Sequence, residues 1–272
     1  MFEQIYSEKW LTKKPQYAFL LGLFYSLLSM VTALILFPGN PSLAAIAFTT
    51  IAIVPSLNRL LQLEENAEAK FKKFSLRKLF SAHKDMMKIY FFMFFGILLT
   101  FSAFSIILPN LARQHLFSSQ LSIYQRMIID GSGAAATFQQ GFFSLLENNL
   151  KVLVIFLILS FIYGAGSVFL LTWNASVWGA IFGYIAHQAA TAQGISPFIA
   201  FLSLFLGVFP HTFLEALGYF GASLSGGIIS TATLREKLFS KKFKIITIDG
   251  LVLFLISAGV IILGAFVEAF LL

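Results

Sequence analysis

Two ionisable side chains, His211 and Glu215, lie inside the apolar segment 208–227. Their spacing of four residues places both side chains on one face of a helix. A carboxylate at membrane depth costs at least roughly 2.5 kcal/mol on insertion scales, so a chain that keeps one there pairs it or uses it. The same face continues with small residues, which let another helix approach closely: Gly218, Ala222 and Gly226. We predict a polar pair at the end of a helix-packing seam inside a membrane.

A second row of small residues ends in a histidine, because Ala175, Gly179, Gly183 and His187 follow one another at a spacing of four. If the two rows pack together, His187, His211 and Glu215 converge in the outer half of the membrane. If residues 196–214 form the crossing helix instead, His211 and Glu215 lie on the cytoplasmic side, far from His187. We favour convergence, because that arrangement has the longer seam.

Three interpretations of the His/Glu group stay open. It is an interhelical hydrogen-bonded pair that fixes packing, or a proton or ion relay, which is the usual use of ionisable residues in membranes. It is otherwise a metal site, since two His and one Glu suit zinc. The chain lacks the His-Glu-x-x-His helix of zinc proteases, so we expect neither a bound metal nor a cofactor.

The composition is that of a membrane protein. Hydrophobic residues make up 58% and charged residues 11% of the chain, and the mean hydropathy is +0.85, whereas soluble domains carry about 25% charged residues. The absence of cysteine excludes disulfides, thiolate metal sites and Cys nucleophiles. Phosphate-binding loops, dinucleotide-binding turns and serine nucleophile motifs are also absent, so active transport would need a separate ATPase or an ion gradient.

The expected fold is all-α, because a bilayer core is crossed by roughly 20 apolar residues in a helix. We expect seven transmembrane helices, with a re-entrant or interfacial helix at 196–209. The spans are 17–37, 42–57, 89–108, 152–173, 175–191, 211–231 and 246–266.

The basic residues predict the orientation, because Lys and Arg mark the cytoplasmic side of a membrane protein. Most of the nineteen lie before the first span, between the second and third spans, or between the sixth and seventh spans. This places the N-terminus inside and the C-terminus outside. Topology thus explains the net charge of +7, and we predict a multi-pass protein of the cell membrane that does not bind nucleic acid.

Three regions follow from these patterns. Residues 1–57 form an N-terminal hairpin of two spans, and residues 58–88 form a cytoplasmic basic amphipathic helix. This helix either lies on an anionic leaflet or is a solvated juxtamembrane helix that extends the third span inward. Residues 89–272 form a five-span core. Its outer segment, 109–150, is expected to be interfacial and is a candidate surface for partners, since loops often carry function.

Several short motifs of the core resemble the SpoIIM family, named for stage II sporulation protein M. They are the Glu-Asn-Asn-Leu run at 147–150, the Gly-rich helix that closes on Asn174, the Pro-His…Glu element starting at Pro210, and the Glu-Ala-Phe run at 268–270. The resemblance covers about residues 70–272 and leaves the first hairpin outside. Ala175 and Thr212 stand where the family has glycine. The residues that match family motifs, beyond His211 and Glu215, are Asn148, Asn149, Asn174, Gly179, Pro210 and Glu268.

This resemblance implies a scaffold, because the sporulation member of the family is a membrane scaffold for peptidoglycan-degrading partners. We therefore expect a non-enzymatic scaffold or subunit of a membrane complex, which contacts the lipid bilayer and assembles with copies of itself or with other membrane proteins. The alternative is a transporter or channel component with a His/Glu ion or proton site. A membrane metallohydrolase is the more distant alternative.

Overall fold

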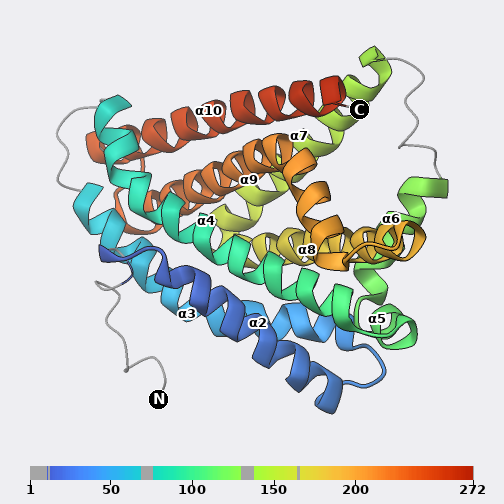
Figure 1. Cartoon of the computed structure of the whole chain (residues 1–272). Coiled ribbons are helices and arrows are strands. Elements are labelled where there is room, and N and C mark those ends of the chain that lie inside the picture. Colours follow the sequence, from blue (N-terminus) through green and yellow to red (C-terminus); the bar gives the residue numbers. More distant parts are fainter. Residues whose placement is uncertain (1–10, 12, 69–75, 130–137, 164–165, 272) are drawn as a thin grey trace.

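The computed structural model describes residues 11, 13–68, 76–129, 138–163 and 166–271, and this part of the chain is almost entirely helical (Figure 1). The predicted all-α class is therefore confirmed for the described residues. The helices in chain order are α2 (Tyr17–Leu36), α3 (Pro41–Glu68), α4 (Leu76–Ile107), α5 (Asn110–Leu116), α6 (Ser118–Ile129), α7 (Phe138–Tyr163), α8 (Ser167–Gln193), α9 (Pro197–Arg235) and α10 (Lys241–Leu271).

Six of these helices, α2, α4, α7, α8, α9 and α10, are long and apolar enough to cross a membrane by length and composition. The apolar part of α3, Pro41–Leu57, is a shorter stretch. Large apolar side chains such as Leu20, Ile155 and Leu255 are exposed along these helices. A bilayer is the solvent in which such faces are stable, so the chain is an integral membrane protein that contacts lipid.

The predicted boundary between the fourth and fifth spans is wrong. Instead of a break at Asn174, α7 ends at Tyr163 and α8 begins at Ser167. Asn174 lies within α8, where its amide donates a hydrogen bond to the Leu170 carbonyl at 2.8 Å. Hydropathy misplaced the break because the residues on both sides are apolar, whereas the glycines at 164 and 166 weaken the helix there.

The predicted separation of residues 196–209 from the crossing helix is also wrong, because α9 is one continuous helix with Pro210 inside it. Its 39 residues extend about 58 Å, twice the thickness of a bilayer core. Figure 1 shows that α9 changes direction along its length. Proline removes one backbone hydrogen bond and kinks a helix, and membrane helices tolerate this where neighbours shield the backbone.

The first helix packs directly onto the core through two glycines. A Cβ atom at Gly22 would collide with the Met93 carbonyl of α4, and one at Gly96 would collide with the Phe19 carbonyl of α2. Small residues that allow such close backbone contact are typical of membrane helix interfaces. Helix α4 also packs against α8 and α9, while α9 packs against α7 and α10.

The outer segment 109–150 contains α5, α6 and the start of α7, and residues 130–137 lie outside the described part. Buried Gln120 in α6 holds this segment against two other helices. Its Oε1 accepts a hydrogen bond from Ser42 Oγ of α3 at 2.7 Å, and its Nε2 donates to Ser176 Oγ of α8 at 3.2 Å. Part of the segment is therefore fixed against the bundle.

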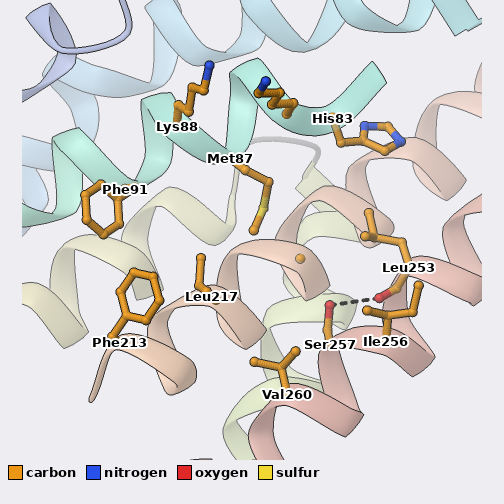
Figure 2. Close-up of a pocket in the computed structure, with 12 residues that line it drawn as sticks. His83, Met87, Lys88, Phe91, Phe213, Leu217, Leu253, Ile256, Ser257 and Val260 are labelled. Carbon is orange, nitrogen blue, oxygen red and sulfur yellow. Dashed lines mark hydrogen bonds between the residues drawn. The ribbon is translucent and has the colours of Figure 1, made fainter. Parts of the chain in front are cut away.

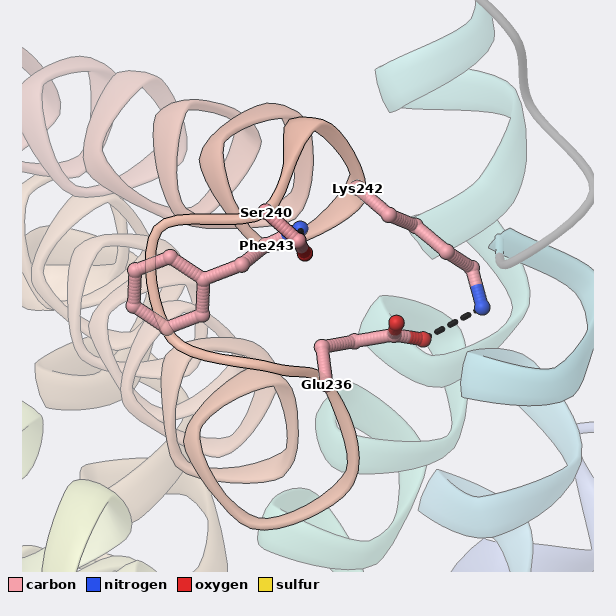
Figure 3. Close-up of polar contacts among 4 residues, drawn as sticks. All are labelled: Glu236, Ser240, Lys242 and Phe243. Atoms are coloured by element: carbon pink, nitrogen blue, oxygen red, sulfur yellow. Dashed lines mark hydrogen bonds and ion pairs between the residues drawn. The ribbon is translucent and has the colours of Figure 1, made fainter.

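At the opposite end, residues 58–88 are divided between the end of α3 and the start of α4, with 69–75 outside the described part. Figure 1 places the start of α4, the start of α2 and the α9–α10 link at the same end of the molecule. In that link Lys242 pairs with Glu236, and Ser240 Oγ accepts the Phe243 N–H at 3.1 Å, as a helix N-cap does (Figure 3). The basic segments thus gather at one end, and the side of the membrane this end faces stays a prediction.

Candidate functional site

Glu215 lies in the second part of α9 and is only 7% exposed. Its Oε1 accepts a hydrogen bond from Asn149 Nδ2 of α7 at 2.6 Å. The Tyr219 hydroxyl, one turn further along α9, donates to Asn149 Oδ1 at 3.1 Å. Asn149 is itself buried, so one amide uses its donor and its acceptor to join two buried polar groups. A buried polar group without a partner is costly, and this arrangement avoids that cost.

A second carboxyl group completes the cluster. The carboxyl group of Glu268 of α10 lies close to that of Glu215. Two carboxyl groups that lie side by side repel each other when both are ionised. Gly264, one turn before Glu268, lies against Glu215, because a Cβ atom there would be 3.5 Å from Glu215 Cγ. We call Asn149, Glu215, Tyr219 and Glu268 the carboxyl cluster; it joins α7, α9 and α10.

The surroundings of the carboxyl cluster are apolar on one side and polar on the other. Buried Phe156 stacks on the Tyr219 ring, with centroids 5.1 Å apart and an interplanar angle of 3°. On the other side, exposed Asn148 donates to Asn149 Oδ1 at 3.4 Å. Next to it, Lys151 forms an exposed ion pair with Glu147 at 2.6 Å. The cluster is therefore buried, but it is one hydrogen bond away from the surface at the start of α7.

The structure does not bring His187, His211 and Glu215 together in one site. His187 lies in the part of α8 that packs, through Ala186 and Ala190, around Ala200 at the start of α9. Glu215 lies beyond Pro210 and faces α7 and α10. Among the described residues, no three His, Asp or Glu side chains form a group that could hold a metal ion.

His211 is half-buried one turn before Glu215. Within the described part of the chain its Nδ1 has no hydrogen-bond partner, while the carboxylate of Glu215 bonds to Asn149 instead. The predicted pair of His211 and Glu215 is therefore not formed; Glu215 is bonded to Asn149 of another helix instead. Pro210 lies in the same turn of α9, where it removes one backbone hydrogen bond of the helix.

We expected the two rows of small residues to pack against each other, but each row packs against other helices. Gly179 and Gly183 of α8 lie against α4, where a Cβ at Gly183 would be 2.6 Å from the Ser102 carbonyl. On α9, Gly218 lies against Ile261 of α10, and Gly226 lies against Leu157 of α7. Ala222, between them, is fully buried. A row of small residues predicts close packing but does not identify the helix opposite.

Sequence reasoning missed two features of the carboxyl cluster. Tyr219 was not singled out, although it follows Glu215 by four residues and therefore shares its helix face. Glu268 was singled out only as a residue that matches a family motif, and the structure places it against Glu215. A polar residue in each of three apolar segments, at 149, 215 and 268, is the signal that could have suggested a shared site.

Comparison with family models gives one match, to SpoIIM, stage II sporulation protein M, over residues 89–271. The matched region contains all four residues of the carboxyl cluster and begins within α4, after the N-terminal hairpin. Comparison with curated proteins and with solved structures gives no match. Since the match covers more than half of the chain and agrees with the motifs of the core, this integral membrane protein belongs to the SpoIIM family.

Proposed function

We propose that this protein is a non-enzymatic subunit of a membrane complex, a multi-pass scaffold of the cell membrane that assembles with copies of itself or with other membrane proteins. The observation that carries the proposal is the carboxyl cluster. Hydrogen bonds of Asn149 join α7 to α9, and the Glu268 carboxyl of α10 lies close to Glu215. Polar contacts of this kind link helices in a membrane, and a fixed bundle is what a scaffold needs.

Two further features support a structural role for the core. Glycines at 179, 183, 218 and 226 bring neighbouring helices into backbone contact, and Gln120 ties the outer segment to α3 and α8. The outer segment also presents an exposed apolar side chain, Leu111, which is 84% exposed at the end of the bundle. Exposed apolar residues beside a rigid body are suited to contacts with other membrane proteins.

A specific observation favours a second candidate, a transporter or channel component. The carboxyl groups of Glu215 and Glu268 lie close together in the interior of the bundle, and Asn148 connects the cluster to the surface. Carboxyl groups inside membranes often mark proton or ion pathways. In this candidate function the pair would bind and release a proton as the bundle changes shape.

Proton flux into liposomes separates the two candidates. The purified protein is reconstituted with a pH-sensitive dye inside, and a pH gradient is applied. We expect vesicles with the wild type and with Glu215→Gln to be equally proton-tight, because glutamine keeps a hydrogen bond to Asn149. The control is Glu147→Gln, which alters an exposed carboxylate on α7. Flux that Glu215→Gln abolishes and Glu147→Gln preserves would establish the transport candidate and defeat the scaffold.

Assembly is tested in native membranes. A photo-crosslinking residue at Leu111 is expected to give a discrete product larger than the 30.2 kDa chain, and mass spectrometry identifies the second component. The same crosslinker at lipid-facing Leu255 controls for random collision. The scaffold proposal fails if both positions yield only the uncrosslinked chain.

A further inference from the structure

A groove of 570 Å³ opens between α4, α9 and α10, away from the carboxyl cluster (Figure 2). Helix α9 packs against both α4 and α10 and forms its floor. Known ligand pockets have volumes of about 300–1,000 Å³, so this groove has the size of a binding site. It adjoins the end of the molecule at which α4 begins and the basic segments gather.

The interior of the groove is apolar. Its walls include Met87 of α4, Leu217 of α9 and Val260 of α10. Phe91 and Phe213 meet edge to face across it, with centroids 5.7 Å apart. The lining contains one hydroxyl group on α10, that of Ser257, which donates to the Leu253 carbonyl at 2.8 Å. An acyl chain suits this surface, because it makes no demand for hydrogen bonds.

The rim of the groove along α4 is basic. Lys84 and Lys88 both line the groove and are exposed, and buried His83 lies beside them. The acidic neighbour is Asp85, whose carboxylate lies 3.7 Å from Lys88 Nζ, with both side chains about half exposed. Two lysines against one exposed aspartate leave this rim positively charged. The basic residues precede Phe91 along α4, so the charged rim and the apolar lining follow one another along that helix.

We infer that this groove binds an anionic phospholipid, with one acyl chain against Met87, Leu217 and Val260 and the phosphate at Lys84 and Lys88. The charge of the rim decides between occupants. A zwitterionic lipid gains less from two lysines, because its own cationic group offsets the charge of its phosphate, whereas basic pockets between membrane helices bind anionic head groups. A transmembrane helix from a partner would fill the apolar walls but leave Lys84 without a counter-charge and Lys88 with Asp85 alone.

Native mass spectrometry of the delipidated protein tests the inference. Phosphatidylglycerol and phosphatidylcholine with identical acyl chains are added in turn, and the bound fraction is measured. We expect phosphatidylglycerol to bind at least about tenfold more tightly, since each lysine near an anionic head group contributes about a factor of five. Lys84→Gln combined with Lys88→Gln removes this preference, and inorganic phosphate does not displace the lipid because it lacks the acyl chain.

Matched variants separate the groove from general surface charge. Lys237→Gln with Lys241→Gln removes two exposed lysines that lie at the same end but do not line the groove, and the preference for phosphatidylglycerol is expected to persist. Ile256→Trp and Leu217→Trp each fill the groove and are expected to weaken binding of both lipids about tenfold. Size-exclusion chromatography and circular dichroism verify that each variant folds. If both tryptophan variants weaken lipid binding equally, the loss is due to the filled groove and not to a packing defect at one position.

Several results would overturn the inference. Equal binding of the two lipids shows that the lysines do not select a head group. Equal loss in the two double lysine variants assigns the preference to the whole basic end. A tryptophan variant that dissociates an oligomer of this chain while lipid binding is unchanged assigns the groove to a second copy.

Discussion

Asn149 is the residue that links the polar side chains of the carboxyl cluster. A single buried amide donates to Glu215 and accepts from Tyr219, and the carboxyl of Glu268 closes the same group from α10. Removing one member leaves other buried groups without partners, which costs more than the lost hydrogen bond alone. Asn149 is buried, whereas Asn148, its neighbour on α7, is exposed. Substituting each asparagine in turn therefore measures what the buried one contributes to stability.

Asn149→Ala is expected to lower the free energy of unfolding by about 2 kcal/mol, because the buried carboxyl of Glu215 and the hydroxyl of Tyr219 lose their partner. Thermal unfolding in detergent measures the change. Asn148→Ala is the control and should shift the midpoint only slightly, since Asn148 is exposed. Equal effects of the two substitutions would show that the cluster does not stabilise the bundle.

At the scale of elements, the helices contact one another through small residues, and each row of them has its own partner. Helix α8 uses Gly179 and Gly183 against α4, where Ser105 Oγ also donates to the Ala180 carbonyl at 2.7 Å. Helix α9 uses Gly218 against α10 and Gly226 against α7. Close backbone approach increases packing contacts, which drive helix association in lipid.

Gly183→Val is expected to destabilise the protein by about 2 kcal/mol, because the added atoms overpack the α8–α4 contact. A Cβ there would lie 2.6 Å from the Ser102 carbonyl and 2.7 Å from Ser105 Cβ. Gly207→Val is the matched control, since a Cβ at Gly207 meets no atom within 4 Å among the described residues. If both variants unfold at the wild-type temperature, the contact is not tight in the membrane.

Pro210→Ala is expected to straighten α9, because alanine restores a backbone donor and removes the ring that clashes with the preceding turn. The chain has no natural cysteine, so spin labels can be placed at Ile199→Cys and Leu234→Cys, both exposed on α9. Pulsed electron paramagnetic resonance should show a longer distance, approaching the roughly 52 Å of a straight helix.

A label pair at Ile248→Cys and Ile262→Cys on α10 controls for global change and should keep its distance. An unchanged distance between the two labels on α9 would mean that packing against α8 and α10, and not the proline, bends the helix.

At the scale of the whole molecule, the six long apolar helices and the shorter Pro41–Leu57 stretch arrange the basic segments at one end (Figure 1). The α8–α9 turn lies at the opposite end. Lys and Arg are retained on the cytoplasmic side of membrane proteins, so the charge distribution predicts one orientation for the entire bundle, including the carboxyl cluster and the lipid groove.

Cysteine accessibility in intact cells is expected to support this orientation. Gln193→Cys, exposed beside the α8–α9 turn, should react with a membrane-impermeant maleimide added outside. Lys237→Cys, exposed in the α9–α10 link, should react only after the membrane is permeabilised. The reverse pattern would invert the topology, and reaction of both positions from outside would mean that α9 does not cross.

The sequence by itself determined the membrane environment, the helical class, the outline of the apolar segments and the family, because hydropathy and short motifs are local properties of the chain. It also marked Glu215 as an ionisable residue in apolar surroundings, and Asn149 and Glu268 as residues that match family motifs. It could not decide the pairing among them, because residues 149, 215 and 268 meet only through the packing of α7, α9 and α10. Tertiary structure alone replaced the expected group of His187, His211 and Glu215 with the carboxyl cluster and assigned each row of small residues its partner. The physical reason is that a helix face is set by spacing along the chain, whereas the helix opposite is chosen by the fit of whole surfaces.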